Sequence, residues 1–376
     1  MKRYFIVNEF FGIRVYDSLL KVEKFFTSSE AEKVKNDLSG NYNYIDNKKP
    51  NSFSAPLKIS MNITKKCNLR CEQCFSDSGI CIKEELSTMQ IYKLLDDMQK
   101  NGTFFICIGG GEPFTREDLF EILEYGKQKQ LAISIVTNSL LLNKSKLEKL
   151  NALDLDYLWV SFEGLKENHE KLRGQGTFDK TIQQLQLIKD YYTGKKAIRM
   201  SINKYNIGEI EDLVSIAEKY DFDLIRFTPL LAFGRASGKN LVIDTNQYIE
   251  FLSKAKNISS KVKIVYPNMK TDKIWIGKNG FGCHCGKEAI WIDEVGDVSP
   301  CIFWGDEYTV GNIKDLEYKD LWNRCLEISN IEGNETCKKC NNYIECRGGC
   351  RARSLFEYGN LNDVDPLCPK KMILKK

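Results

Sequence analysis

This sequence of 376 residues is poor in histidine and in long apolar runs. Its two histidines, His169 and His284, are too few for a histidine-rich metal site or a histidine-based catalytic triad. The longest apolar runs, such as residues 131–136, are far shorter than the ~20 residues that a membrane-spanning helix needs. Near the N-terminus, Asn8 and Glu9 interrupt the apolar run, so there is no signal-peptide core. We therefore expect a cytoplasmic protein without a membrane partner.

An excess of one charge sign is also missing. The chain has 55 basic and 51 acidic residues, a net charge of +4, and the basic residues are scattered along it. Nucleic-acid-binding domains usually concentrate positive charge on one face, so we expect no nucleic-acid partner. Hydrophobic residues make up 42% of the chain, which is enough for a packed core and excludes a disordered or collagen-like protein.

Cysteine, in contrast, is abundant, with 14 residues. Disulfide scaffolds are typical of short secreted proteins, whereas cysteines in a long cytoplasmic chain more often bind metal. The first group is Cys67, Cys71 and Cys74, spaced C-x3-C-x2-C directly after a predicted strand. Three thiolates can hold three irons of a [4Fe–4S] cluster and leave the fourth iron open to another ligand. From spacing alone, a zinc site with three thiolates remains the alternative.

The middle of the chain alternates short apolar strands with helical periodicity. The predicted strands are Leu57–Thr64, Phe104–Gly109, Ala132–Asn138, Tyr157–Phe162, Lys196–Asn203 and Leu224–Leu230. Each is nearly continuously apolar or β-branched, as in strands buried on both faces of a parallel sheet. Six strand–helix units predict an α/β fold, either an open six-unit barrel or a doubly wound sheet. In both, the active site lies at the carboxyl ends of the strands.

The first cysteine group resembles the signature of the radical S-adenosylmethionine (SAM) superfamily. Residues 109–114, Gly-Gly-Gly-Glu-Pro-Phe after the second strand, resemble the family's GGEP motif, and residues 161–174 resemble a later family stretch. The resemblance covers roughly residues 57–370 and implies a partial (β/α)6 barrel of the TIM type. It implies that Cys67, Cys71 and Cys74 hold a [4Fe–4S] cluster. The residues expected around SAM are Gly110, Gly111, Glu112, Gln73, Ser161 and Arg173.

Gln73 departs from the family pattern, which usually has an aromatic residue or a histidine beside the adenine at that position. The backbone of Gln73 is still able to pair with adenine. The departure therefore concerns the adenine contact rather than the family resemblance.

The C-terminal cysteines resemble the SPASM extension of the same superfamily, a pattern of seven cysteines and a glycine, here Gly296. Cys283 adds an eighth thiol, and eight is the number that two fully ligated [4Fe–4S] clusters require. By the resemblance, Cys283, Cys285, Cys301 and Cys350 hold one auxiliary cluster, and Cys337, Cys340, Cys346 and Cys368 hold the other. Because C-x-C is unusually close spacing, the alternative is that one of the first two cysteines does not ligate and an iron faces the substrate.

Three cysteines remain outside these groups. Cys107 lies in a predicted strand and Cys325 in a helical stretch, so we predict that both are buried thiols packed as small apolar side chains. Cys81 follows the first cysteine group, and we assign it no function.

Four segments are predicted. Residues 1–55 form a small β-hairpin and helix, with strands at 4–11 and 13–22, and either bind a leader peptide or cap the barrel. Residues 56–240 form the radical SAM barrel, residues 241–282 are a bridging segment, and residues 283–376 form the cysteine-rich auxiliary-cluster domain.

The resemblance implies an oxidoreductase that generates a 5′-deoxyadenosyl radical to modify a peptide or protein. Maturation of a ribosomally made precursor (RiPP) by a thioether or carbon–carbon crosslink is the expected reaction. The partners are then the peptide, with or without a leader segment, and an electron donor such as flavodoxin or ferredoxin. The residues identify no catalytic base.

Three alternatives remain. One is modification of a small molecule or a tetrapyrrole. Another is formylglycine formation, which Ile302 disfavours, because sulfatase-maturing relatives have an aspartate after the cysteine that matches Cys301. The third belongs to a different class, a non-catalytic zinc or iron–sulfur module.

Overall fold

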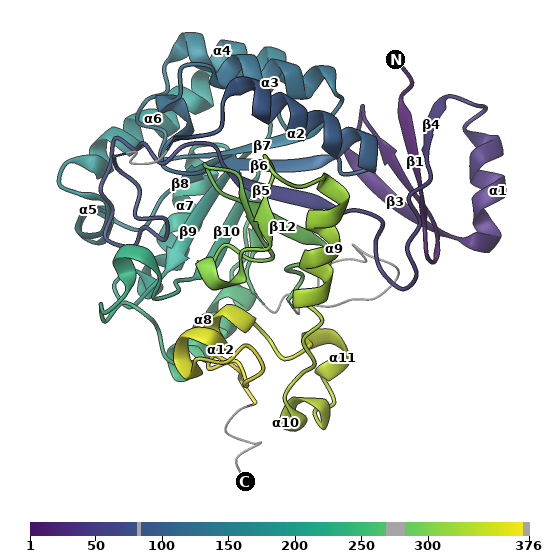
Figure 1. Cartoon of the computed structure of the whole chain (residues 1–376). Helices are drawn as coiled ribbons and strands as arrows, with labels where there is room; N and C mark the ends of the chain where they lie inside the picture. The colour runs from purple at the N-terminus through teal and green to yellow at the C-terminus, as the bar shows by residue number, and fades with distance from the viewer. Residues whose placement is uncertain (81–83, 268–282, 371–376) are drawn as a thin grey trace.

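The computed structural model describes residues 1–80, 84–267 and 283–370 (Figure 1). Its main element is a ten-stranded sheet in the order β11-β10-β9-β8-β7-β6-β5-β12-β13-β14. The strands are β5 (Lys58–Asn62), β6 (Phe105–Gly109), β7 (Ala132–Thr137), β8 (Tyr157–Ser161), β9 (Lys196–Ile202), β10 (Leu224–Pro229), β11 (Lys263–Val265), β12 (Ala289–Ile292), β13 (Asp297–Ser299) and β14 (Gly311–Asn312). Neighbouring strands from β11 to β12 are parallel, and β13 and β14 are antiparallel.

Helices cover the outer face of the parallel strands (Figure 1). They are α2 (Thr88–Asn101), α3 (Leu119–Gln128), α4 (Lys144–Leu153), α5 (Lys166–Arg173), α6 (Thr177–Tyr191) and α7 (Ile210–Lys219). The helix α8 (Thr245–Asn257) follows, and the C-terminal segment contributes α9 (Tyr318–Ile328), α10 (Glu335–Lys338), α11 (Tyr343–Cys346) and α12 (Arg351–Tyr358). Short 3-10 turns occur at Pro113–Thr115, Ile207–Glu209, Gly234–Ala236 and Asp306–Tyr308. None of the described helices is long and apolar enough to cross a membrane.

The two faces of the strands differ, as in a barrel. Met200 and Ile202 of β9 belong to the large core between sheet and helices. Ala197, on the opposite face of the same strand, packs with Trp159 and Leu224 in a separate inner cluster. Side chains of a strand point alternately to its two faces, so the inner cluster marks the inside of the barrel. The prediction of a partial barrel, left open against a doubly wound sheet by periodicity, is confirmed.

Residues after the barrel also contribute to its sheet. β12 lies in the segment predicted as the C-terminal domain, and it pairs in parallel with β5. The bridging segment begins with α8 and β11, and its residues 268–282 lie outside the described residues, as does Cys81.

The N-terminal segment is larger than the predicted hairpin and helix. It is a four-stranded sheet in the order β3-β2-β1-β4. Its elements are β1 (Tyr4–Glu9), β2 (Gly12–Asp17), β3 (Val22–Thr27), α1 (Ser28–Asp37) and β4 (Tyr42–Ile45). The predicted second strand at 13–22 was too long, because the chain turns after Asp17 and Lys21 adopts a positive φ of 53°. β3 and β4 are the edge strands of this sheet. Their side chains are partly exposed, and their sequences lack the long apolar run by which a buried strand is predicted.

This sheet lies beside the barrel (Figure 1), and aromatic stacking attaches the two. The rings of Tyr16 and Phe104 stack with centroids 4.4 Å apart and an interplanar angle of 4°. The Tyr16 hydroxyl donates to the carbonyl of Gln130 at 3.0 Å.

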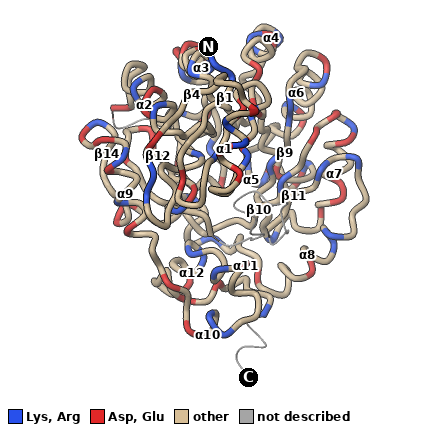
Figure 2. Tube along the Cα trace, turned by 90° about the vertical axis from the view of Figure 1, so that its right-hand side faces the viewer, with Lys and Arg blue, Asp and Glu red and all other residues tan. Residues whose placement is uncertain are grey.

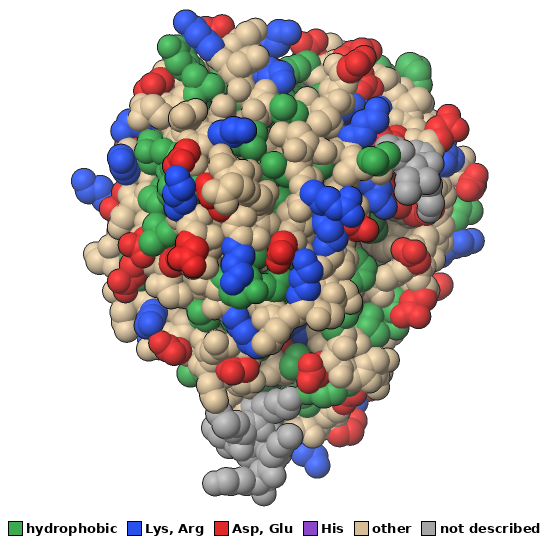
Figure 3. All heavy atoms as spheres, turned by 90° about the vertical axis from the view of Figure 1, so that its left-hand side faces the viewer, with side chains coloured by type: hydrophobic (Ala, Val, Ile, Leu, Met, Phe, Trp, Pro, Cys, Tyr) green, Lys and Arg blue, Asp and Glu red, His purple; other side chains and the backbone are tan. Residues whose placement is uncertain are grey.

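Lysine, arginine and acidic side chains are interspersed over the molecule in Figures 2 and 3.

A buried ionic group holds the N-terminal sheet together. The Arg14 side chain is fully buried, and its Nε donates to Glu9 at 3.1 Å while its Nη1 donates to Glu23. Glu9 also accepts from the Ser54 amide at 2.9 Å, which ties the sheet to the linker before β5. Burial raises the pKa of Glu23 to about 7, with a smaller contribution from the nearby Glu9, while Arg14 opposes the shift.

Replacing the cation should therefore weaken this sheet in a pH-dependent way. We expect Arg14→Met to lower the free energy of opening by about 3–5 kcal/mol at pH 7.5, because two carboxylates remain buried without a counter-charge. A buried carboxyl with a raised pKa costs stability above that pKa, so the loss should shrink as pH falls toward 5 and the carboxylates take up protons. Hydrogen exchange of β2 amides, corrected for intrinsic rates, measures the loss of free energy and its dependence on pH. Lys24→Met, on an exposed side chain of β3, is the control, and equal protection in the two variants would contradict the prediction.

Candidate functional site

One cavity of about 280 Å³ lies where the parallel strands end, and we call it the barrel cavity. Its lining includes all three cysteines of the first group. It also includes most of the residues predicted around SAM: Gln73, Gly110, Gly111, Ser161 and Arg173. The cysteines lie on the loop after β5, the glycines on the turn after β6, and Ser161 at the end of β8. Segments far apart in sequence thus meet at the edge that the fold class predicts.

Two glycines allow the turn after β6 to lie against the cysteine loop. Gly110 has a φ of +126°, and a Cβ on it would overlap the carbonyl of Thr64. A Cβ on Gly111 would overlap the carbonyl of Lys66. The Gly111 amide donates to Thr64 at 2.7 Å, and the Glu112 amide donates to Lys66 at 2.8 Å. The glycines are therefore required by backbone contact between the two loops that form the cavity.

Glu112 supports the cavity without lining it. Its side chain is 0% exposed, and its carboxylate accepts from Thr137 Oγ1 at 2.7 Å, from the Asn138 amide at 2.7 Å and from the Phe114 amide at 3.2 Å. Burial raises the pKa of Glu112, and these donors oppose that shift. The carboxylate therefore holds the end of β7 to the glycine turn. Asn138, whose amide it binds, lines the cavity, whereas Glu112 itself does not.

Arg173 brings positive charge to the cysteines. Its guanidinium donates to Glu163 at 3.1 Å, and Glu163 in turn accepts from the Ser201 amide at 2.8 Å. Burial raises the pKa of the Cys71 thiol, and Arg173 opposes this by favouring the thiolate. Sequence reasoning missed Glu163 as the residue that orients Arg173, although it stands in the quoted 161–174 stretch.

His169 lies in the interior, next to Glu163. It is fully buried, and its Nδ1 accepts from the Glu163 amide at 3.3 Å. Burial and the nearby Arg173 lower its pKa to about 3, so the imidazole is neutral at physiological pH. It therefore fixes the backbone at Glu163 and carries no charge into the cavity.

Arg235 is a further residue that sequence reasoning passed over. It follows β10, and its guanidinium donates to the carbonyls of Cys71 at 2.7 Å and Ser78 at 2.8 Å. It thereby ties the last barrel strand to the cysteine loop. Its only signal in the sequence is weak, the Gly234-Arg235-Ala236 stretch.

A second cavity, of about 240 Å³, is lined by two of the first four auxiliary cysteines. Cys283 and Cys285 line it, together with Trp304 and Arg347. The Cys285 thiol is hydrogen-bonded to both Cys283 and Cys301. Its pKa is well above the usual range, and Cys350 lies close enough to contribute to this rise. The four residues predicted to share one cluster are therefore neighbours.

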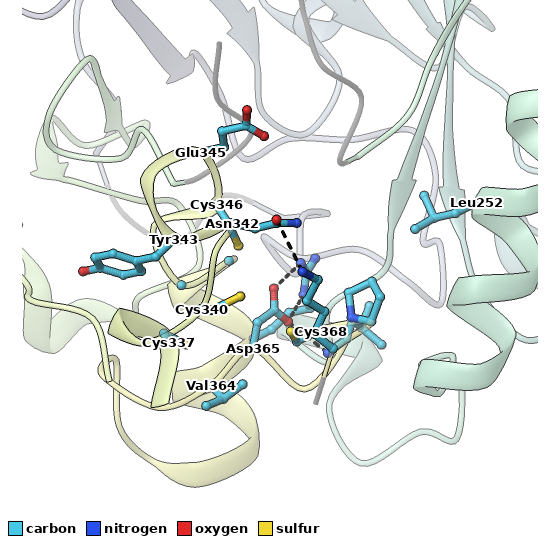
Figure 4. A pocket seen from close by; sticks show the side chains of 16 residues that line it. Leu252, Cys337, Cys340, Asn342, Tyr343, Glu345, Cys346, Val364, Asp365 and Cys368 are labelled. Atoms are coloured by element: carbon cyan, nitrogen blue, oxygen red, sulfur yellow. Dashed lines mark hydrogen bonds and ion pairs between the residues drawn. The ribbon is translucent and has the colours of Figure 1, made fainter. Parts of the chain in front are cut away.

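A third cavity, of about 390 Å³, is lined by all four cysteines of the other predicted group: Cys337, Cys340, Cys346 and Cys368. Figure 4 shows the sulfur atoms of Cys340, Cys346 and Cys368 around this space. Arg353 forms two hydrogen bonds to Asp365, at 2.7 and 2.6 Å, on the cavity wall. Asp365 also accepts from the Cys350 amide at 2.7 Å, so one carboxylate connects the wall of the third cavity to a cysteine of the first auxiliary group.

The remaining cysteines differ from one another. Cys325 is fully buried in the main core, as expected for an apolar thiol. Cys107 is only partly buried and lines the barrel cavity, so the prediction of a core thiol was wrong. The reason is register, because Cys107 has the strand parity of inward-facing Ser60 and Ser134.

The thiols fit iron–sulfur clusters in number and arrangement. Three cysteines line the barrel cavity, two line the second cavity and four line the third, whereas within the described ranges no three histidine, cysteine or acidic residues lie close enough to hold a single metal ion. Ligands spread around a cavity suit a cube of iron and sulfide. In the barrel cavity, the buried Oε1 of Gln73 and Nε of Arg173 have no hydrogen-bond partner among the described residues, which fits a polar ligand beside the cysteines.

Comparison with known proteins agrees with these sites. Residues 61–217 match the family described as the radical SAM superfamily, and residues 283–348 match SPASM, an iron-sulfur cluster-binding domain. The chain is 27% identical over 332 residues to mycofactocin maturase MftC of Mycolicibacterium smegmatis, covering 84% of this chain and 83% of that one. It is also 27% identical to AdoMet-dependent heme synthase of Methanosarcina barkeri, covering 84% and 97%. The structure of Streptococcus suis SuiB bound to precursor peptide SuiA has the same fold, with a TM-score of 0.75, 18% identity and coverage of 97% and 98%.

The role found for Glu112 is testable by a change of one atom. Glutamine at this position places an amide NH₂ where an oxygen accepted a hydrogen bond, so at least one buried donor loses its partner. We expect Glu112→Gln to lower stability by about 1–3 kcal/mol. Thermal unfolding of the cluster-loaded protein measures this loss. Glu117→Gln, on an exposed side chain nearby, is the matched control, and equal melting temperatures would contradict the assignment.

Proposed function

This chain belongs to the radical SAM superfamily and carries its SPASM domain, and we propose that it modifies a peptide or protein in the barrel cavity. Its cofactors are [4Fe–4S] clusters and SAM. The observation that carries the proposal is the composition of this one cavity, which runs from the three cysteines into the barrel and is closed by Trp291, Ile302 and Phe303 of the C-terminal segment. Ile302 follows Cys301, so the cavity reaches both the first cysteine group and an auxiliary group.

The residues have distinct proposed roles. Cys67, Cys71 and Cys74 would hold the first cluster, and the residues around SAM would be Gln73, Gly110, Gly111, Ser161 and Arg173, with Glu112 fixing the glycine turn from behind. When bound, SAM and the reduced cluster supply a carbon radical that takes a hydrogen atom from the substrate. Arg173 balances the negative charge of the thiolates, and Ile302 and Phe303 exclude water from the reacting carbon.

The C-terminal groups would hold two further clusters, three in all. Cys285 contacts both Cys283 and Cys301, which supports ligation by both members of the C-x-C pair. The second group would consist of Cys337, Cys340, Cys346 and Cys368. Clusters in these places would accept the electron that the substrate gives up. A flavodoxin or ferredoxin would reduce the first cluster.

Several observations support a peptide as the substrate. The relative MftC is a maturase, and the SuiB fold, seen with a precursor peptide, extends over the N-terminal sheet of this chain. That sheet has β3 at its edge, and an edge strand can pair with an extended leader segment. Ile302 offers no carboxylate base to the cavity, which disfavours formylglycine formation. The heme synthase relative supports a tetrapyrrole as the second candidate.

The function is tested with the anaerobically reconstituted enzyme, SAM, a strong reductant and peptides encoded by short reading frames beside the gene. We expect one peptide to lose the mass of two hydrogen atoms, as crosslink formation requires. SAM cleavage without a mass change in any peptide, but with conversion of an added iron porphyrin, would favour the tetrapyrrole.

The first cluster is tested with two cysteines of the same cavity. We expect Cys71→Ala to abolish reductive SAM cleavage and to lower the iron content from about twelve to about eight per chain. Cys107→Ala should retain both, because Cys107 lines the cavity from β6 and is not one of the proposed ligands. Iron analysis and quantification of 5′-deoxyadenosine check this. A C71A protein with full iron and full cleavage would disprove the assignment.

An auxiliary cluster is tested in the same way. Cys340→Ala should leave SAM cleavage in place but remove the modified peptide, since the electron from the substrate has no acceptor. Cys325→Ala, at a buried thiol outside the cavities, is the control and should form product. Mass spectrometry of the peptide measures the outcome, and an unchanged product yield in C340A would remove the proposed role.

A further inference from the structure

Two arginines lie side by side on the inner face of the barrel. Arg199 of β9 and Arg226 of β10 are direct partners in the parallel register. Arg199 lies between Ala197, in the inner cluster, and Ser201, which lines the barrel cavity. Arg226 lies in the same way between Leu224 and Thr228. Both residues therefore lie on the inner face of the strands, where Arg199 lines the barrel cavity and Arg226 is solvent-exposed beside it.

The positive charges of this pair are not balanced by protein groups. Within the part of the chain that the structure describes, neither guanidinium forms a hydrogen bond or an ion pair. Arg226 is solvent-exposed, and the titratable groups that act on it are Arg199, Cys107 and Tyr157 rather than carboxylates. Lys58 of β5, also an inward position, adds a third positive charge. Like charges at facing strand positions are unfavourable, so the arrangement fits a site for an anion.

The surroundings hold the pair in place and leave its donors free. The Arg226 Cζ lies 4.9 Å from the centre of the Trp159 ring, a cation–π contact that fixes the guanidinium without using its N–H groups. Arg199 lines the barrel cavity together with Trp291. The Trp291 Nε1 is buried and has no hydrogen-bond partner among the described residues, so it is a further donor without an acceptor.

The pair lies just below the proposed cofactor end of the cavity. Ser201, two residues after Arg199, donates its amide to Glu163, which binds Arg173 beside the cysteines. Two residues along a strand span about 6.6 Å. An anion on Arg199 would therefore lie one layer of side chains deeper than the proposed cofactor site.

We propose that Arg199 and Arg226 bind a carboxylate of the substrate and thereby set which residue enters the barrel cavity. This inference rests on the proposed function. Guanidinium groups match the planar, two-oxygen geometry of a carboxylate. The carboxylate comes either from an aspartate or glutamate side chain next to the modified residue or from the C-terminus of the peptide. In both cases the arginines are positioning residues that do not take part in hydrogen transfer.

The test is calorimetric titration of the reconstituted, cluster-loaded protein with three small probes. Acetyl-glutamate α-amide carries a side-chain carboxylate, acetyl-glycylglycine carries a C-terminal one, and acetyl-glutamine amide is neutral. We expect one or both acids to bind at least about tenfold more tightly than the neutral probe. The acid that binds more tightly identifies the source of the carboxylate.

Variants connect this binding to the two arginines. Arg199→Gln and Arg226→Gln should each weaken binding of the preferred acid about tenfold or more. The control is Lys180→Gln, on an exposed side chain of α6, which should bind the acid like the wild type. Iron content and SAM cleavage without peptide, measured on the same samples, show that each variant is folded and loaded.

Three results would overturn the inference: equal binding of the neutral probe, no saturable binding of either acid, or unchanged affinity in both arginine variants. Failure of the proposed function is a separate outcome. It would appear as absence of SAM cleavage in the wild type, and the titration does not depend on that reaction.

Discussion

The site depends on backbone contact between two loops at the carboxyl ends of adjacent strands. The turn after β6 lies against the cysteine loop after β5 so closely that no side chain fits at Gly110 or Gly111. Two amide–carbonyl hydrogen bonds fix the contact, and Glu112 ties the end of β7 to it. Because three strand ends are joined in this way, the cysteines cannot move independently of the barrel. Such rigidity is what a cluster that must accept an external ligand requires.

Positively charged side chains lie next to the cysteine groups. Thiolates and the clusters they would hold are anionic, and Arg173, Arg235 and Arg353 lie beside the cysteine groups. Each of these arginines is itself oriented by a carboxylate: Glu163, Asp77 and Asp365 respectively. Arg199 and Arg226 differ because no protein carboxylate accompanies them. The first three arginines are held in place by protein carboxylates, whereas Arg199 and Arg226 remain available to bind a substrate.

Much of the fold and of the site was predictable from local sequence. The six barrel strands were placed within a few residues, because continuous apolar runs mark strands buried on both faces. The family resemblance predicted a group of Cys337, Cys340, Cys346 and Cys368, and these four thiols line one cavity. Prediction failed where the signal was weak or long-range. β3 and β4 are partly exposed edge strands, and the buried position of His169 depends on Phe162 and Phe178 packing around it.

The sequence by itself determined the cysteine groups, the order of the strands and the glycines that the loop contact needs. These are local properties, in which spacing along the chain fixes chemistry. The tertiary structure alone decided that Glu112 supports the cavity from behind, that Cys107 faces the cavity and that Arg199 and Arg226 stand together without a counter-charge. These depend on strand register and on how one loop lies against another, and a shift of one residue would reverse every inward and outward position.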